Sequence, residues 1–108
     1  MRMGWWLLTA LLLALAGCTP LVHADCSDDG DCPESCFSEN RELPGGLCSK
    51  SCDHNDECPS GTFCIDKLGG ICLVACSSMQ ECDDFHHGYI CKDEKDVAGK
   101  HQLVCLGD

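Results

Sequence analysis

Residues 52–76 read CDHNDECPSGTFCIDKLGGICLVAC and contain five of the cysteines of the chain. Two apolar runs, residues 62–65 and 71–74, stand on either side of the polar, glycine-containing segment 66–70. Apolar runs of this length bounded by turn residues are typical of short strands, so the pair predicts a β-hairpin. Residues 53–57 are mostly Asp, Asn and Glu, and such residues predict a polar turn at the entrance to the hairpin.

The same cysteine spacing occurs three times along the chain. The units start at Cys26, Cys52 and Cys76, and in each of them five residues separate the first cysteine from the second. An acidic residue comes directly before each second cysteine, and a proline follows it in the first two units. A recurring period of this length predicts small modules packed one after another, so we divide the chain into repeats over residues 26–51, 52–75 and 76–108.

The third repeat predicts a hairpin like that of the second, with residues 89–91 paired with residues 103–105 across a longer polar loop at 92–100. The first repeat is degenerate, because only three residues separate Cys32 from Cys36 and a long polar loop follows. Outside the N-terminal leader no apolar stripe with a 3.6-residue period has useful length. We therefore expect a small disulfide-rich fold of tandem short β-hairpins and loops, with little or no helix.

Thirteen cysteines in 108 residues exceed the level at which a short chain reads as a disulfide scaffold. Twelve of them belong to the repeats, four to each. Within a repeat we expect the first cysteine to pair with the third and the second with the fourth, although four cysteines allow three connectivities and spacing alone does not distinguish them. The twelve expected disulfide cysteines are Cys26, Cys32, Cys36, Cys48, Cys52, Cys58, Cys64, Cys72, Cys76, Cys82, Cys91 and Cys105.

The N-terminus has the pattern of an export signal. Arg2 supplies a positive charge, and residues 5–16 form an apolar stretch that is too short to span a bilayer. Residues 15–18, Leu-Ala-Gly-Cys, resemble the lipobox of bacterial lipoproteins, in which the cysteine is acylated and becomes the new N-terminus. We therefore expect a signal peptide over residues 1–17, lipidation of Cys18 and a tether over residues 18–25.

A second cleavage site competes with the first. Val22-His23-Ala24 fits the preference of ordinary signal peptidase, and cleavage there would make residues 1–24 the signal peptide of a soluble chain. An odd cysteine in an exported protein needs an explanation, and both sites leave twelve cysteines, because Cys18 is either lipidated or removed. The resemblance to Gram-negative lipoproteins implies sorting to the outer membrane, since Thr19 rather than Asp follows the cysteine.

The repeats also resemble the cysteine-rich units of bacterial surface lipoproteins. The similar phrases are CDHNDECPSGTFC at 52–64 and GGICLVAC at 69–76, and the resemblance covers residues 26–105. Animal extracellular modules of Dickkopf and whey-acidic-protein type share related spacing, although this chain lacks the adjacent cysteine pair of the latter. The bacterial family implies a place on the outer membrane or cell surface, attached through an N-terminal lipid, and implies no particular activity.

Charge and composition exclude several other functions. The formal net charge is −11, so the phosphates of nucleic acid would be repelled and no nucleic-acid partner is expected. We expect no metal and no other cofactor. The acidic run 28–31 is interpreted as a solvated turn rather than a calcium loop, and segment 83–87 as a polar loop tip. Zinc is disfavoured because cysteines pair with one another in an oxidising compartment.

Two function classes remain for a chain of this kind. The first is a non-enzymatic, lipid-anchored interaction module whose rigid loops contact other molecules, including an extracellular protein. The second is a secreted small protease inhibitor or another soluble disulfide-rich binding protein. Residues 37–47 form the candidate contact loop, with Arg41 as a possible anchor and Pro44 as a rigid position. An enzyme is not expected, because nothing in the sequence positions a nucleophile.

Overall fold

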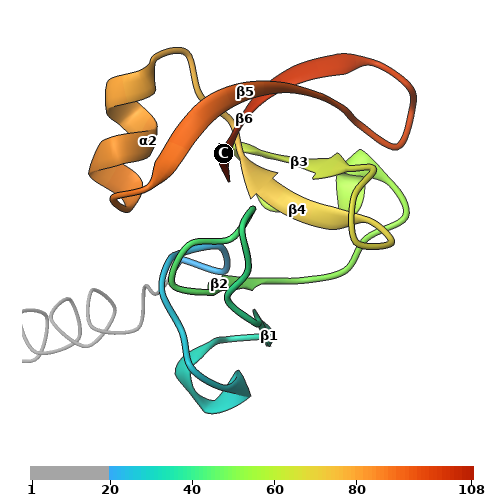
Figure 1. The fold of residues 1–108 in the computed structure, drawn as a ribbon. Helices are drawn as coiled ribbons and strands as arrows, with labels where there is room; N and C mark the ends of the chain where they lie inside the picture. The colour runs from blue at the N-terminus through green and yellow to red at the C-terminus, as the bar shows by residue number, and fades with distance from the viewer. Residues whose placement is uncertain (1–19) are drawn as a thin grey trace, which may run out of the picture.

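The computed structural model describes residues 20–108. They form three antiparallel hairpins, which follow one another through the molecule in Figure 1. Each hairpin is a separate two-stranded sheet, and short helical segments precede the strands. The strands are β1 (Ser35–Phe37), β2 (Leu47–Ser49), β3 (Thr62–Ile65), β4 (Ile71–Val74), β5 (Tyr89–Lys95) and β6 (His101–Gly107). The expected class, a small disulfide-rich fold of short β-hairpins, is confirmed.

The second hairpin has the bounds expected from the sequence, with Cys64 opposite Cys72. The third is longer than expected. Tyr89–Lys95 pairs with His101–Gly107 along its whole length, so the connecting loop covers only residues 96–100 rather than 92–100. Over residues 92–95 and 101–104 exposed residues alternate with partly or fully buried ones, as on strands with one solvent-facing side, and this pattern extends the strands into a region that looked like loop.

Six disulfides staple the hairpins, and each joins two cysteines of one repeat. In every repeat the first cysteine pairs with the third and the second with the fourth, which confirms the interlaced arrangement. One bridge of each repeat thus ties the start of the unit to the first strand, and the other ties the entry turn to the second strand. The bridges are Cys26–Cys36, Cys32–Cys48, Cys52–Cys64, Cys58–Cys72, Cys76–Cys91 and Cys82–Cys105.

The acidic residue before each second cysteine caps a helical turn. Asp31 accepts hydrogen bonds from the backbone N–H groups of Ser27 and Asp28, at 2.9 and 3.4 Å, and closes the 3₁₀ turn η1 (Asp29–Asp31). Glu57 does the same from the end of η2 (Asn55–Glu57). These backbone hydrogen bonds lower the pKa of both carboxyl groups below the usual value. The repeated acid therefore has a structural role in shaping the entry turn.

The third repeat contains a real helix at the same position, α2 (Met79–Phe85), which the sequence analysis did not anticipate. Proline follows the second cysteine in the first two repeats and forces that cysteine into an extended conformation, which ends the turn. Asp83 stands in that place in the third repeat, so the helix continues for two turns. Ser78 caps it by accepting from the N–H of Glu81 at 3.3 Å.

A second shared contact links each turn to its hairpin. The residue three positions after the first cysteine accepts a hydrogen bond from the backbone N–H of the third cysteine. The acceptors are Asp29 Oδ1 at 2.8 Å, Asn55 Oδ1 at 2.8 Å and Met79 Sδ at 3.3 Å. Three different side chains thus accept the same backbone hydrogen bond at the same position of each repeat.

Glycine is required two residues before the fourth cysteine in the first two repeats. A Cβ at Gly70 would lie 2.0 Å from the carbonyl oxygen of Cys52, and one at Gly46 would lie 2.5 Å from that of Cys26. Both glycines also have positive φ angles, which other residues rarely adopt. The carbonyl of the first cysteine thus passes directly over the hairpin, and only glycine leaves room for it.

The three repeats share one core. Fully buried side chains come from all of them, including Leu43 and Leu47 of the first, Leu73 of the second and Leu106 of the third. The first repeat also contacts the third directly, since the N–H of Gly107 donates to Glu42 O at 2.7 Å. The molecule is therefore a closed cluster of three hairpins, whereas the sequence predicted a linear array in which each unit contacts mainly its neighbour. Within residues 20–108 no helix is long and apolar enough to cross a membrane.

Leu68, at the tip of the β3–β4 hairpin, has a φ of 53° and is 53% exposed. A leucine in the left-handed region costs about 1–2 kcal/mol of folding free energy. Glycine avoids this cost, but it also gives the unfolded chain more conformational freedom, which offsets part of the stabilisation. We expect Leu68→Gly to raise the free energy of unfolding by about 0.5–1 kcal/mol, measured by denaturant titration. Gly69→Ala, at a φ of 79°, should act in the opposite direction, and destabilisation by both variants would contradict the strain at Leu68.

Candidate interaction loop and N-terminal segment

The segment that precedes the first repeat is part of the folded structure. Val22 is buried with 7% of its surface exposed, and Leu21 and Ala24 pack against the core. His23 pairs with Cys48 through two backbone hydrogen bonds of 3.1 and 2.8 Å, which adds one residue pair to the free edge of β2. Residues 18–25 were expected to be a tether, and the structure differs because apolar residues in this segment find a place on the core. Cys18 lies outside the described residues.

The next two residues continue this attachment. The N–H of Cys26 donates to Gly45 O at 3.1 Å, and the carboxylate of Asp25 lies 3.6 Å from Nε2 of His86 at the end of α2. The N-terminal segment therefore contacts both the first and the third repeat.

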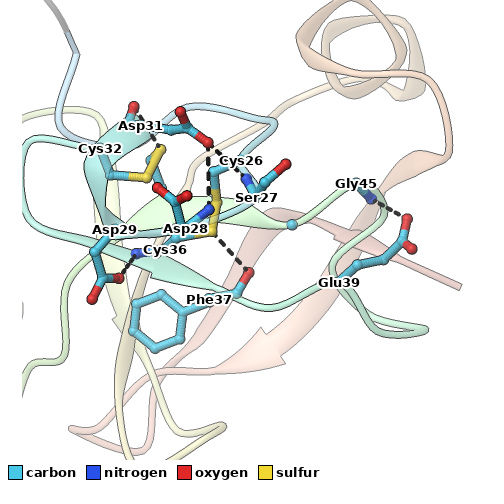
Figure 2. The surroundings of a disulfide bond; sticks show 12 residues. Cys26, Ser27, Asp28, Asp29, Asp31, Cys32, Cys36, Phe37, Glu39 and Gly45 are labelled. Carbon is cyan, nitrogen blue, oxygen red and sulfur yellow. Dashed lines mark hydrogen bonds between the residues drawn. A yellow bond between two sulfur atoms is a disulfide. The ribbon is translucent and has the colours of Figure 1, made fainter.

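The loop over residues 37–47 is anchored at several points. Leu43 is fully buried. Pro44 packs so closely against Gly88 and Gly107 of the third repeat that a Cβ on either glycine would contact its ring. Glu39 accepts a hydrogen bond from the N–H of Gly45 at 2.9 Å, which Figure 2 shows at the right of the view. The loop thus serves as the connection between the first and third repeats, and Pro44, expected as a contact residue, is partly buried within it.

Arg41 is exposed at the apex of this loop, as the contact-loop prediction requires. Its neighbours form a tight turn, in which the backbones of Asn40 and Leu43 bond each other at 3.1 and 3.4 Å. The side chain of Asn40 also accepts from the N–H of Glu42 at 2.8 Å. The backbone groups on both sides of Arg41 are therefore already paired within the loop, which gives this part of the loop a fixed conformation.

One lysine, Lys67, links all three repeats. Lys67 Nζ of the second repeat binds Glu42 of the first and lies 3.8 Å from Glu94 Oε1 of the third. The hydrogen bond to Glu42 raises the pKa of Lys67. Because the side chain stays about a third exposed, this cluster orients the repeats more than it stabilises them.

The acidic run 28–31 uses its carboxylates within the turn. Asp28 Oδ1 accepts from the N–H of Gly30 at 2.9 Å, Asp29 holds the N–H of Cys36, and Asp31 holds that of Ser27. Figure 2 shows these carboxylates gathered around the Cys26–Cys36 bridge. Each of these three carboxylates accepts a hydrogen bond from the backbone of its own repeat, so the acidic run forms a capped turn.

Residues 83–87, expected as a loop tip, instead form the end of α2 and its exit. His87 Nδ1 lies 3.1 Å from Asp83 Oδ1 one helical turn earlier, whereas His86 faces Asp25. The rings of His86 and Phe85 both meet Tyr89 edge to face. Burial raises the pKa of the Tyr89 phenol above its usual value, so the hydroxyl stays protonated.

The sequence analysis overlooked Asp96, a buried carboxylate with 2% of its surface exposed. Its Oδ1 accepts from the backbone N–H groups of Ala98 and Lys100, both at 2.9 Å. Its Oδ2 accepts at 3.1 Å from the amides of Gln102 and of Asn55, which belongs to the second repeat. These hydrogen bonds lower the pKa of Asp96 to about 2. The available signal was Asp96-Val-Ala-Gly99, a turn sequence between two strands.

Asp96→Asn is expected to lower the melting temperature by several degrees at pH 7, because the new amide group would face the amide donors of Asn55 and Gln102. The depressed pKa stabilises the fold above the unfolded-state value of roughly 4, and this contribution disappears as the pH falls toward 2. The difference in melting temperature between wild type and variant should therefore shrink as the pH is lowered from 5 to 2. Thermal melts across this pH range measure it.

Asp93→Asn provides the matched control, since Asp93 is an exposed carboxylate on the same hairpin and pairs with exposed His101. That variant should melt within about a degree of wild type, as removal of exposed ion pairs usually does. Equal shifts for Asp93→Asn and Asp96→Asn would show that the buried network adds nothing specific.

An open groove lies where the described chain begins. Its walls are residues 20–22 of the N-terminal segment, residues 59–62 of the turn before β3, and Val74 at the end of β4, and its volume is about 360 Å³. The walls are mostly apolar, and none of these residues carries an ionisable side chain. The sequence analysis did not anticipate this groove, because its walls come from segments about 40 residues apart.

The chain matches no protein-family model, no curated protein and no solved structure in comparisons with all three. Its hairpins, shared core and six bridges define a small disulfide-rich module of the extracellular type.

Proposed function

We propose that the protein is an exported bacterial lipoprotein, anchored through Cys18 to the outer membrane, which displays a disulfide-stapled surface for binding other extracellular molecules. The leader, the Leu-Ala-Gly-Cys sequence at 15–18 and the oxidised cysteines support export and anchoring. The binding role involves no catalysis, and in residues 20–108 every cysteine is held in a bridge, so that part offers no thiol nucleophile.

One observation carries the choice between the two cleavage sites. Cleavage after Ala24 would remove Val22 from the core together with both hydrogen bonds between His23 and Cys48. Cleavage before Cys18 keeps the whole segment. The packed N-terminal segment therefore favours processing at Cys18, which leaves an acylated terminus directly beside the folded module.

Fractionation tests the anchor. The wild-type protein should sediment with membranes, and Cys18→Ser should lose the lipid and the mature N-terminus at position 18, because only the thiol accepts diacylglycerol. Thr19→Ser is the matched control and should fractionate like wild type. Wild-type protein recovered from culture supernatant with Asp25 at its N-terminus would contradict the proposal and support the soluble alternative.

Trimming tests the structural argument independently of any lipid. A chain that starts at Asp25 should have a free energy of unfolding about 2 kcal/mol lower than that of a chain that starts at Thr19. The shorter chain loses the burial of Val22 and two backbone hydrogen bonds. Both chains keep six disulfides, so denaturant titration compares them directly. Equal stability would remove the support that the packing gives to cleavage at Cys18.

A further inference from the structure

The groove beside Pro20 lies next to the expected point of membrane attachment. We propose that this groove faces the bilayer and takes up lipid acyl chains at the membrane surface, so that the module has one fixed orientation on the membrane. This proposal rests on the proposed lipid anchor at Cys18. It adds a lipid-binding surface to a molecule whose anchor alone would leave its orientation open.

The chemistry of the walls selects the ligand. Leu21, Val22 and Val74 supply branched aliphatic surface, and Pro20 and Pro59 add rigid apolar rings. The polar side chains in the lining are the small hydroxyls Ser60 and Thr62, and the hydroxyl of Thr62 donates to Pro59 O at 2.6 Å within its own turn. A wall of this kind gains free energy by removing hydrocarbon from water and offers nothing to a charged ligand.

The length of chain between anchor and groove places them together. Pro20 lines the groove and stands two residues after Cys18, so their Cα atoms are at most about 7 Å apart. Pro20 is itself held close to the module by the residues that follow it, since Val22 is buried and His23 is paired with Cys48. A lipid on Cys18 would therefore hold the groove at the bilayer surface.

Charge supports apolar contact over electrostatic binding. The chain has a formal net charge of −11, so anionic headgroups would repel most of its surface. The groove lining has no ionisable side chain, so its own residues add nothing to that repulsion. The expected contact is thus with acyl chains of the bilayer, and vesicles of uncharged phosphatidylcholine are the suitable probe.

Tryptophan quenching tests the orientation. Both tryptophans of the chain, Trp5 and Trp6, lie in the leader, so the mature protein starting at Cys18 contains none. Ser60→Trp places a single reporter in the groove, and Leu68→Trp places one at the exposed tip at the other end of the β3–β4 hairpin. Each lipidated variant is reconstituted into phosphatidylcholine vesicles with and without bromine on the acyl chains.

The groove reporter should lose about half of its fluorescence to brominated chains, because a surface-bound apolar face reaches the acyl boundary, and the tip reporter should lose little. Val74→Trp gives a second groove reporter if Ser60→Trp does not form six bridges. Unquenched groove reporters in lipidated, vesicle-bound protein overturn the orientation and leave the anchor standing. A mature protein without lipid overturns both proposals.

Discussion

Replacing Leu43 with alanine is expected to lower the free energy of unfolding by about 3 kcal/mol, in the middle of the range for fully buried leucines. Leu43 belongs to the long loop of the first repeat, yet none of its surface is exposed and it joins the core that the three repeats share. Removing its side chain leaves a cavity between repeats, which the bridges prevent from collapsing. Urea titration of the oxidised protein measures the loss.

Arg41→Ala is the matched control, two residues away on the same loop with an exposed side chain. This variant should change the free energy of unfolding by less than about 0.5 kcal/mol, as exposed substitutions usually do. A loss below about 1 kcal/mol for Leu43→Ala would mean that the loop is a peripheral surface feature and that the repeats do not share a core through it.

Replacing both Cys82 and Cys105 with alanine is expected to cost about 3.5 kcal/mol, because this bridge closes the longest loop of the six, with a sequence separation of 23. Both cysteines are buried, and the bridge holds α2 against the third hairpin. The two-turn helix is too short to persist without that attachment. The loss should therefore appear both in denaturant titration and as reduced helical circular dichroism.

The matched control is the double variant Cys26→Ala with Cys36→Ala, whose bridge has a sequence separation of 10 and whose cysteines are partly exposed. It should cost about 2.8 kcal/mol and leave α2 intact. If the Cys82–Cys105 variant kept its helical signal and lost no more stability than this control, α2 would not depend on the bridge.

The covalent plan of the fold could be predicted in part, because the cysteine spacing repeats three times and indicates two bridges within each repeat, whereas the choice among the three possible connectivities of a repeat needed the structure. The β3–β4 hairpin could be predicted residue by residue, since its apolar runs are bounded by turn signals. Helix α2 was missed because it has no apolar stripe. Its signal was Ser78-x-x-Glu81 together with Asp83 in the place of proline, and such capping residues decide short helices.

The contacts between repeats could not be predicted, because cysteine spacing describes only what happens within a unit. Leu43 looked like part of a polar loop, and only the fold shows that the loop reaches the third repeat. The N-terminal segment looked like a tether for the same reason. Residues 20–24 have no periodic pattern, and their packing depends on an unpaired edge of β2 that the sequence does not display.

Intact mass of the protein isolated from its native host tests the central claim most directly. The account predicts a chain that starts at Cys18, carries covalent lipid and gains about 12 Da on full reduction, since six disulfides take up twelve hydrogens. A lipid-free chain starting at Asp25, or a smaller gain on reduction, would contradict it.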